Sequence, residues 1–452
     1  MDWLKIAQSY KDEFIEKTQA LLKIPTLLVT FDPQNFEAPF GNPIRQALDW
    51  FLYMGEADGF KIKNIDNYAG HLEIGSGKEV LGILGHLDVV PTGGKWDYPP
   101  FGATLVDGKI FARGAMDDKG PSMAAYIAMK MVKDQHLNLT KKVRLILGCD
   151  EESGMRCIRR YLEKEQMPDI GFAPDADFPL IYGEKGNFSW DITGNESNEL
   201  IESIHAGERY NVVPDECVAV LKRDVKPAFE AYLNEHQYQG KVEESTYTIF
   251  GKNSHAAWPY KGVNAIFLMA EFLKTQTDSK LIDYLVRYLT HDFYGKKLGI
   301  DHFDPEMKEL TINLAIIKYE KSSFKVGVNI RYPNGFDFTN QIAKVDRSIV
   351  EYGFTYVPLH ASKPHYISPE DPLVKILLAA YQKYSHDYES PIVTIGGGTY
   401  ARTLKKAVAF GPNLPQNPDL AHQPNEYLVI DEMIMAAAIY AEAIEHLATE
   451  QV

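Results

Sequence analysis

The hydrophobic positions at the start of the chain recur at helical spacing. From Leu4 to Leu22 they fall on one face, which predicts a single amphipathic helix that ends before Pro25. A second helix is expected from Pro43 to about Ala57, because proline is favoured in a first helical turn. Short strand-like runs follow around Ile62 and Leu72.

The next stretch alternates apolar, strand-like runs with helical ones, as in a wound α/β sheet. These runs cover residues 80–84, 121–132, 143–147, 158–162 and 170–173. After about Gly183 the rhythm changes. The segments NFSWDITG and ECVAVLKRDV are typical of an antiparallel sheet, and helices are expected near 264–274 and 281–289.

The α/β rhythm returns at about Tyr366 with strands at 392–395 and 408–410 and a long helix from Asp431 to about Leu447. The predicted fold class is therefore α/β, with a mixed, mostly parallel sheet flanked by helices and an inserted α+β domain. The expected boundaries are 1–184 for the first part of the main domain, 185–364 for the insertion and 365–452 for the second part.

Composition and charge narrow the classes of partner. The formal net charge of −15 opposes binding to nucleic acid or anionic lipid, which both depend on Lys and Arg. No stretch reaches the roughly 18 apolar residues of a membrane span. The three cysteines, Cys149, Cys157 and Cys217, show no disulfide or metal spacing, and the N-terminal segment does not resemble a signal peptide. We therefore expect a cytoplasmic protein.

The densest chemical motif is GHLDVVP, at the end of an apolar strand. His86 and Asp88 lie two positions apart and therefore point to the same face. Both then lie at the carboxyl edge of the sheet, where ligands bind in open α/β folds. A histidine there can be a core group or a metal ligand oriented by a carboxylate, and this motif alone does not separate the two.

Further acidic motifs and a late histidine follow along the chain. ARGAMDDKGP places two adjacent carboxylates, Asp117 first, before a helix. DEES places Glu151 and Glu152 after an apolar strand, where successive residues face different ways and can hold different roles. PDADFP and AHQPNE supply Asp175 and His422.

Together these residues predict a metal site at one edge of the sheet. We expect four strand ends to deliver His, Asp, Glu and Asp, with a second His from the C-terminal part. Carboxylate and imidazole ligands without thiolate suit zinc, manganese or cobalt, and they are more than one tetrahedral ion needs. Two ions are therefore expected. Such a pair can share a bridging carboxylate and a bridging hydroxide, which supplies a nucleophile at neutral pH.

In these ordered motifs the chain resembles a family of dinuclear zinc peptidases and deacylases. That family includes carboxypeptidase G, aminoacylase, succinyl-diaminopimelate desuccinylase and the dipeptidase V type. The motifs His-x-Asp, Arg-Gly-x-x-Asp-x-Lys-Gly, Glu-Glu, Asp and a late His occur in this order, and the likeness spans essentially the whole chain. The long insertion is most similar to that of dipeptidase V, in which an enlarged lid closes the site within a monomer.

The resemblance implies a ligand set for two metal ions. His86, Asp117 and Asp175 would hold one ion. Asp117 would bridge to the second ion, which Glu152 and His422 would complete. Two divalent cations are thus implied as cofactors, with zinc first and manganese or cobalt as alternatives.

Further roles follow from the same resemblance. Asp88 would orient the ring of His86 through its other nitrogen. Glu151 would be the general base that takes a proton from the attacking water. Exchanging the roles of Glu151 and Glu152 is the rival assignment, although the family order places the base first. A cis peptide bond between Asp117 and Asp118 is also implied.

The insertion resembles the family's lid. His255, in GKNSHAAWPYKGVNA, matches a histidine that stabilises the tetrahedral oxyanion, and the alternative is a surface-loop histidine. Asn211 and Arg331 match substrate-binding positions, and Arg331 is suited to a substrate carboxylate. The loop GGGTYAR matches a glycine-rich loop of the family, which implies that its backbone amides and Arg402 help to seat that carboxylate. The competing interpretation is a phosphate-binding loop, which would require a Lys that this segment lacks. The implied contacts of the loop are Gly397, Gly398, Thr399 and Arg402.

The predicted function is metal-dependent hydrolysis of dipeptides by a monomeric enzyme whose partner is a small peptide substrate. The nearest alternative is an N-acyl-amino-acid deacylase or desuccinylase, which shares every metal ligand and differs on the amine side of the bond. A relative without catalysis would lack the base, whereas Glu151, His255 and all five candidate ligands are present.

Overall fold

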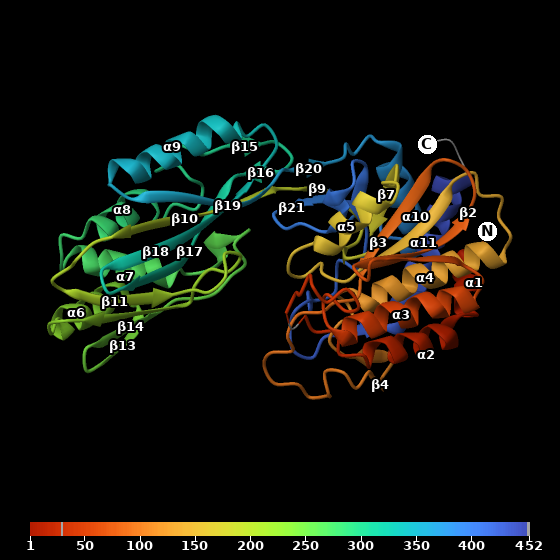
Figure 1. The fold of residues 1–452 in the computed structure, drawn as a ribbon, viewed down its shortest axis with the longest axis horizontal. Coiled ribbons are helices and arrows are strands. Elements are labelled where there is room, and N and C mark those ends of the chain that lie inside the picture. The colour runs from red at the N-terminus through yellow and green to blue at the C-terminus, as the bar shows by residue number, and fades with distance from the viewer. Residues whose placement is uncertain (29, 450–452) are drawn as a thin grey trace. The chain divides into compact units, whose positions relative to one another are not determined.

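The computed structural model describes residues 1–28 and 30–449, which form two compact units (Figure 1). Unit 1 comprises Met1–Tyr182, Ile367–Val393 and Gly398–Val452. Unit 2 comprises Gly183–Tyr366 and Thr394–Gly397.

Unit 1 is built on a mixed sheet in the order β1-β2-β6-β3-β7-β22. The sheet continues through β9 and then β20. The chain leaves unit 1 within β9 and returns to it after β20. The central strands β6, β3, β7 and β22 are parallel, and the pairs outside them are antiparallel. The expected mixed α/β sheet flanked by helices is confirmed, with its parallel pairs gathered at the centre. The strands are β1 (Lys61–Ile65), β2 (Ala69–Gly75), β3 (Val80–His86), β6 (Lys142–Gly148), β7 (Ile170–Ala173), β9 (Ile181–Glu184), β20 (His365–Tyr366), β21 (Val393–Ile395) and β22 (Ala407–Ala409).

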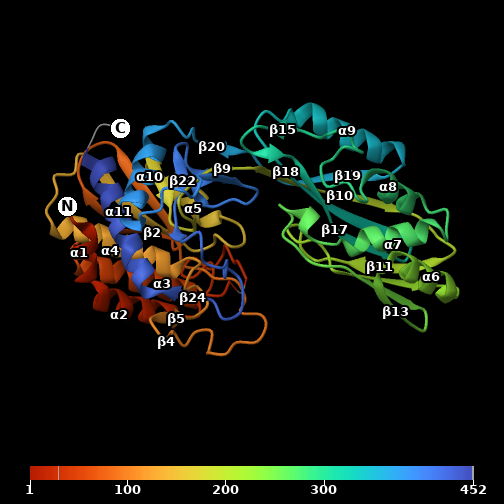
Figure 2. The same ribbon diagram turned by 180° about the vertical axis from the view of Figure 1, so that it is seen from behind.

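Helices cover both faces of this sheet, which explains why β3 is buried along its whole length. On β2, Gly70 lies against Leu52 of α3, while the next residue, His71, bonds Tyr161 of α5. Successive strand residues point to opposite faces, so α3 and α5 lie on opposite sides. Figure 2 shows α11 beside α4. The helices are α1 (Trp3–Gln8), α2 (Lys11–Leu22), α3 (Asn42–Ala57), α4 (Lys119–Asp134), α5 (Arg156–Lys164), α10 (Pro372–Ser385), α11 (Ile430–Thr449) and the 3-10 helix η2 (Tyr400–Thr403).

Two small sheets complete unit 1. One joins β24, β5 and β4, and the other joins β23 and β8. Their bounds are β4 (Thr104–Val106), β5 (Lys109–Phe111), β8 (Ala176–Asp177), β23 (Pro412–Asn413) and β24 (Tyr427–Val429).

The single helix expected from Leu4 to Leu22 is wrong, because the chain forms α1 and α2 with a break between them. Ser9 ends α1, and its hydroxyl donates to the carbonyl of Ile6 at 2.6 Å. A serine side chain that bonds a neighbouring backbone carbonyl competes with the hydrogen bonds of the helix. The hydrophobic spacing continues across this break and therefore conceals it.

Unit 2 contains an antiparallel sheet in the order β13-β14-β12-β11-β17-β18-β10-β19. Its helices α6, α7, α8 and α9 share one apolar core with the sheet. The strands are β10 (Gly186–Asn195), β11 (Ile201–Ala206), β12 (Glu216–Leu221), β13 (Gln239–Glu243), β14 (Thr246–Phe250), β17 (Thr311–Glu320), β18 (Ser323–Tyr332) and β19 (Thr355–Ser362). The other elements are α6 (Lys226–His236), η1 (Pro259–Lys261), α7 (Ala265–Lys274), α8 (Lys280–Tyr288), α9 (Phe338–Glu351), β15 (Phe303–Asp304) and β16 (Lys308–Glu309).

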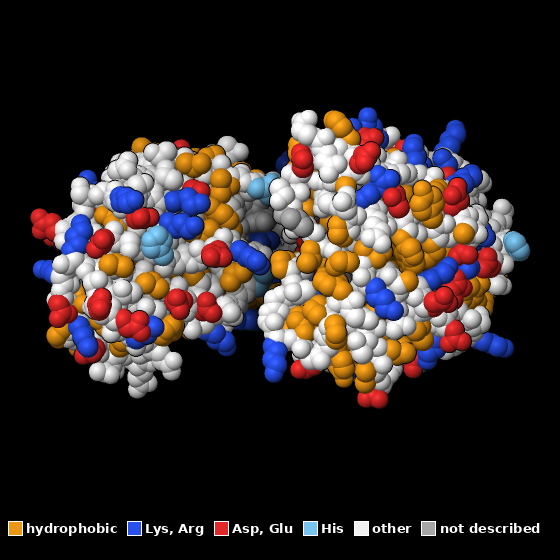
Figure 3. Space-filling view, turned by 60° about the horizontal axis from the view of Figure 1, so that its bottom comes forward, with side chains coloured by type: hydrophobic (Ala, Val, Ile, Leu, Met, Phe, Trp, Pro, Cys, Tyr) orange, Lys and Arg blue, Asp and Glu red, His pale blue; other side chains and the backbone are white. Residues whose placement is uncertain are grey.

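Acidic and basic side chains are interspersed on the face shown in Figure 3. The net charge of −15 therefore coexists with side chains of both signs on that face. Among the described helices, none is at once long enough and apolar enough to cross a membrane.

An aromatic cluster on β7 provides a test of the core of unit 1. Phe172 is fully buried, and its ring lies 5.7 Å from that of Phe410 and 5.4 Å from that of Tyr440. We expect Phe172→Ala to lower the free energy of unfolding by about 3–5 kcal/mol, because it leaves a cavity in a packed core. Urea denaturation measures this loss. The control Tyr388→Ala, at a side chain 65% exposed, should change this free energy by less than about 0.5 kcal/mol, and equal losses in the two variants would contradict the packing of Phe172 in the core.

Candidate functional site

Three adjacent strands of unit 1 direct candidate ligands to one edge of the sheet. β3 ends at His86, β6 is followed by Glu152, and β7 is followed by Asp175. Because β6, β3 and β7 are parallel neighbours, their carboxyl ends meet at the same edge. Asp117 comes from the loop before α4, so the expectation of four strand ends is corrected to three strand ends and one loop. His422 lies in the segment between β23 and β24, at a positive φ of 65°.

The two carboxylate oxygens of Asp117 face two different histidines. Its Oδ1 lies 3.1 Å from Nε2 of His86, and its Oδ2 lies 2.9 Å from Nε2 of His422. Nε2 of His86 is also 3.7 Å from Oδ2 of Asp175, and Nε2 of His422 is 3.1 Å from Oε1 of Glu152. Ligand atoms of His86, Asp117 and Glu152 all lie within 4.8 Å of one another. This arrangement is the one a bridging carboxylate requires.

The tautomer of His86 explains why this cluster suits a cation. Its Nδ1 lies 3.0 Å from the carbonyl oxygen of Asp88, which can only accept, so Nδ1 carries the proton and donates. In the neutral ring, Nε2 then presents a lone pair to the Asp117 carboxylate. That nitrogen is buried and makes no hydrogen bond of acceptable geometry. Two electron-pair donors that face each other in a buried site fit a divalent cation between them.

Electrostatics in the cluster lead to the same conclusion. Burial, followed by the charge of Asp117, raises the pKa of Glu152 to about 7 and also raises the pKa of Asp175. Hydrogen bonds with Asp117 and Glu152 raise the pKa of His422 to about 11. These pKa values are raised because the groups are largely buried and several carboxylates are crowded together. A bound cation compensates the same negative charge and reverses these shifts.

Glu151 and Glu152 are held through the side chain of Asp88. The Asp88 carboxylate accepts the backbone N–H of Glu151 at 3.1 Å and of Glu152 at 3.2 Å. Its Oδ1 is 3.6 Å from Nδ1 of His86, so the contact expected with that ring is made by the main-chain carbonyl. Asp88 thereby connects the first histidine with the glutamate pair. Burial, together with the charges of Asp175 and Glu152, raises the pKa of Glu151 well above its usual range.

The peptide bond between Asp117 and Asp118 is cis, which confirms that expectation. Asp118 is fully buried, and its Oδ2 accepts the backbone N–H of His86 at 3.0 Å and the hydroxyl of Ser122 at 2.9 Å. The second aspartate of the pair is therefore a support for β3, while the first faces the histidines.

Sequence reasoning missed the groups that fix the loops around the cluster. Glu426 and Arg113 form a buried ion pair at 2.6 Å, although both stand inside motifs that the sequence displays. Asp150 is fully buried, and its Oδ2 accepts from Nε of Arg156 at 2.6 Å. Glu426 is the acidic residue at the end of the motif AHQPNE, and this position was a signal that could have identified it. Its partner Arg113 lies far away in the sequence, so the ion pair could not be predicted.

In unit 2 the segments that carry Asn211 and His255 lie side by side. The backbone N–H of Ala256 donates to the carbonyl of Asn211 at 2.9 Å, and Val212 forms a bridge with His255. The backbone N–H of Ala257 donates to Nδ1 of His255 at 3.2 Å. In its neutral form this ring therefore carries its proton on Nε2.

Arg331 lies on β18 of unit 2, with 6% of its surface exposed. Its Nε donates to Oδ1 of Asn329 at 3.1 Å, and its Nη1 donates to the carbonyl of Gly396 at 3.1 Å. Gly397 follows Gly396 in the same unit. Arg331 therefore contacts the start of the glycine-rich loop.

The remaining loop residues belong to unit 1. Oγ1 of Thr399 accepts the backbone N–H of Ala401 at 3.1 Å at the start of η2. A Cβ atom at Gly398 would lie 2.1 Å from Nη1 of Arg402, so a glycine there allows the guanidinium to pack against the backbone.

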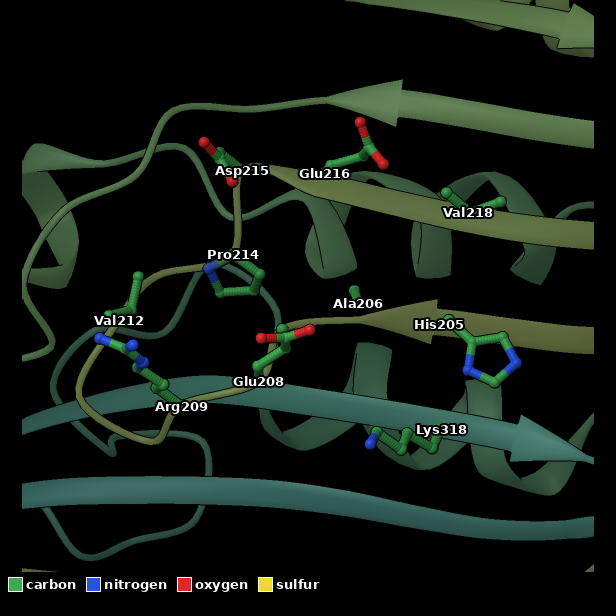
Figure 4. A pocket seen from close by; sticks show the side chains of 11 residues that line it. His205, Ala206, Glu208, Arg209, Val212, Pro214, Asp215, Glu216, Val218 and Lys318 are labelled. Atoms are coloured by element: carbon green, nitrogen blue, oxygen red, sulfur yellow. The ribbon is translucent and has the colours of Figure 1, made fainter. Parts of the chain in front are cut away.

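Unit 2 also has a hollow of about 680 Å³ on its sheet (Figure 4). His205, Val218 and Lys318 project into it from β11, β12 and β17, with the helices behind the sheet. Arg209 and Glu208 line its rim on the loop that leads to Asn211. Its lining mixes both signs of charge and differs from the acidic cluster of unit 1.

Three comparisons relate this chain to known proteins. The model of the peptidase family M20/M25/M40 matches residues 82–446. Proteins named as candidate dipeptidases from Staphylococcus haemolyticus and Bacillus subtilis are each 39% identical over 99% of this chain and 100% of their own length. Human carnosine dipeptidase 1 has a similar fold, with a TM-score of 0.60 at 15% identity over 98% of both chains. An M20 family metallo-carboxypeptidase from Sulfolobus solfataricus gives 0.61 at 18% identity, over 96% of this chain and 98% of that one.

The facing lone pairs predict that divalent cations stabilise unit 1. At a free ion concentration a hundredfold above Kd, each site should add about 3 kcal/mol and raise the melting temperature by roughly 5–10 °C. Thermal unfolding with zinc, manganese or cobalt, before and after chelation, measures the shift, and elemental analysis should give two ions per chain.

A matched pair of histidine variants separates the site from general metal binding. His86→Ala should lower the ion content and reduce the thermal shift, whereas His205→Ala, at the hollow of unit 2, should leave both unchanged. Equal responses of the two variants would show that the cluster around Asp117 is not the binding site.

Proposed function

We propose, from its membership of the peptidase family M20/M25/M40, to which the chain belongs, that this protein is a metal-dependent dipeptidase. The family resemblance drawn from the ordered motifs is confirmed by this match and by relatives that share 39% identity over nearly the whole chain. The dipeptide specificity is supported by the names of those relatives.

One observation carries the chemical part of the proposal. Asp117 directs one carboxylate oxygen at His86 and the other at His422, in a cluster completed by Glu152 and Asp175. The proposed ligand set divides into His86, Asp117 and Asp175 for one ion and Asp117, Glu152 and His422 for the other. When bound, two divalent ions supply Lewis acidity and a nucleophile at neutral pH.

The chain's own residues supply the proton transfers. Glu151 is the proposed general base, which accepts the proton of the attacking water and passes it to the leaving amine. Asp88 fixes the backbone of Glu151, which defines the direction in which the Glu151 side chain leaves the main chain. Glu152 is fixed by the other oxygen of the same carboxylate, which keeps base and ligand in a constant relation.

The residues of unit 2 have proposed roles in recognition and charge stabilisation. His255 donates from Nε2 to the oxyanion, a role supported by the contact of Nδ1 with the backbone of Ala257. Arg331 binds the substrate carboxylate, supported by Asn329, which orients its guanidinium. Further proposed substrate contacts are Asn211 and Gly397 of unit 2 and Gly398, Thr399 and Arg402 of unit 1.

The proposal includes zinc as the ions, a monomer as the active form and the cytoplasm as the location. Imidazole and carboxylate ligands support zinc, with manganese or cobalt able to replace it. The three cysteines are free and buried, which supports a reducing compartment. The proposed monomer is supported by the large inserted unit.

The test of function is an assay of the purified, metal-loaded protein on dipeptides, tripeptides and N-acyl amino acids. Hydrolysis of dipeptides with release of two amino acids supports the proposal. Preference for acyl amino acids would move the assignment to a deacylase that shares the same ligands.

Glu151→Gln should keep the metal content of the wild type and lower kcat at least about 10²-fold, since a positioned general base contributes 10² to 10⁴. Elemental analysis and steady-state kinetics separate the two effects. Glu163→Gln, at an exposed position on α5, is the matched control and should be neutral. Near-normal turnover at full occupancy would remove Glu151 from the mechanism, and loss of one ion would support the exchange with Glu152.

Arg331→Ala should lower kcat/KM for dipeptides by about 10² to 10³, because a charge-assisted contact worth about 3 kcal/mol is lost. The wild type should cleave tripeptides and C-terminally amidated dipeptides poorly, and the variant should discriminate less against the amides. The exposed Arg287→Ala variant of unit 2 is the control. An equal loss on all substrates would assign Arg331 to the structure of unit 2 alone.

A further inference from the structure

A buried ion pair connects three segments around the proposed metal site of unit 1. Glu426 is fully buried, Arg113 is 1% exposed, and Oε2 of Glu426 lies 2.6 Å from Nη1 of Arg113. The segments are the exit from β3, the loop that leads to Asp117 and the loop that begins at His422. The pair therefore lies where the proposed ligands of both ions converge.

The Glu426 carboxylate fixes the backbone of the Asp117 loop. Its Oε1 accepts the backbone N–H of Met116 at 2.7 Å and of Asp117 at 3.2 Å, and its Oε2 accepts that of Gly114 at 3.2 Å. With the bond from Arg113, one buried carboxylate thus accepts from four donors. Because one of these donors is the backbone of Asp117 itself, the carboxylate controls the direction in which that side chain leaves the loop.

The guanidinium of Arg113 fixes the other two segments through carbonyl groups. Its Nη2 donates to Pro91 at 3.2 Å and to His422 at 3.2 Å, and its Nη1 donates to Gln423 at 3.2 Å. The first carbonyl belongs to the segment that follows His86 and Asp88. The other two belong to the loop on which His422 is held at a positive φ of 65°.

We propose that Arg113 and Glu426 are positioning residues that preset Asp117 and His422 for metal binding. Neither side chain is itself a proposed ligand. A planar guanidinium and a carboxylate are suited to this task, since both form several bonds at fixed angles. The inference rests on the proposed metal-dependent function. It means that the contacts of this pair hold the ligand loops in place before the ions bind.

The test compares Glu426→Gln with a matched control, Glu73→Gln, by cobalt titration of the metal-free protein. A glutamine amide has one acceptor oxygen and directs N–H groups at donors, so it cannot replace the four contacts of Glu426. Glu73 forms a similar buried pair with Arg144, at 2.7 Å, between β2 and β6 of the same unit. Both substitutions remove one buried charge, but only the first touches the ligand loops.

For Glu426→Gln we expect cobalt affinity to fall by about 10- to 100-fold, as for other outer partners of metal ligands, and the visible absorption spectrum of bound cobalt to change. For Glu73→Gln we expect a comparable loss of thermal stability in the metal-free protein, with affinity within about 2-fold and an unchanged spectrum. Unchanged affinity in Glu426→Gln, or an equal fall in both variants, would overturn the inference.

Arg113→Lys provides a second measurement if Glu426→Gln fails to fold. It keeps the positive charge but loses the fork, so it should weaken cobalt binding and alter the spectrum in the same direction. Wild-type affinity in that variant would also overturn the proposal. These readouts do not depend on peptide hydrolysis. Absence of dipeptide cleavage by the loaded wild type would therefore contradict the proposed function and leave the positioning result standing.

Discussion

The main electrostatic constraint on unit 1 is that several electron-pair donors face one another at one edge of its sheet. In the neutral form of His86, Nε2 presents a lone pair to the Asp117 carboxylate, and Glu152 and Asp175 add negative charge around them. Such an arrangement is costly unless protons or cations occupy it. The raised pKa values of Glu152 and His422 are the consequence in a metal-free chain. Bound divalent cations would also compensate the negative charge of these carboxylates.

Holding these groups together requires donors from the rest of the unit. Asp88 accepts from the backbone of the two glutamates, Asp118 accepts from the backbone of His86, and Glu426 accepts from the loop of Asp117. Each support is a carboxylate that bonds backbone N–H groups, so the loops are fixed without the use of ligand side chains. A site with strong internal repulsion can persist because the backbone around it is restrained independently of the ions.

The fold class and the grouping of His86, Glu152 and Asp175 could be predicted from the sequence because both depend on local patterns, whereas Asp117 comes from a loop and His422 from a distant segment. Alternation of apolar runs locates β3, β6 and β7, and residues directly after parallel strands must share an edge. Other features depend on contacts between distant segments. Arg113 and Glu426 are 313 positions apart, and no spacing rule connects them. The break between α1 and α2 was hidden because it involves a hydrogen bond from the Ser9 hydroxyl to the carbonyl of Ile6, which hydrophobic spacing does not register.

In two histidines, a single backbone contact to Nδ1 determines whether Nε2 of the neutral ring accepts or donates a hydrogen bond. In His86, Nδ1 donates to a carbonyl, so Nε2 is left as an acceptor suited to a cation. In His255, Nδ1 accepts from the N–H of Ala257, so Nε2 is left as a donor suited to a developing negative charge. Residue type alone cannot distinguish these roles, and neither can the neighbouring sequence. The distinction arises only when the fold places a carbonyl beside one ring and an amide beside the other. The proposed division of labour, with metal binding in unit 1 and oxyanion stabilisation by His255, therefore depends on backbone geometry as much as on the identity of the side chains.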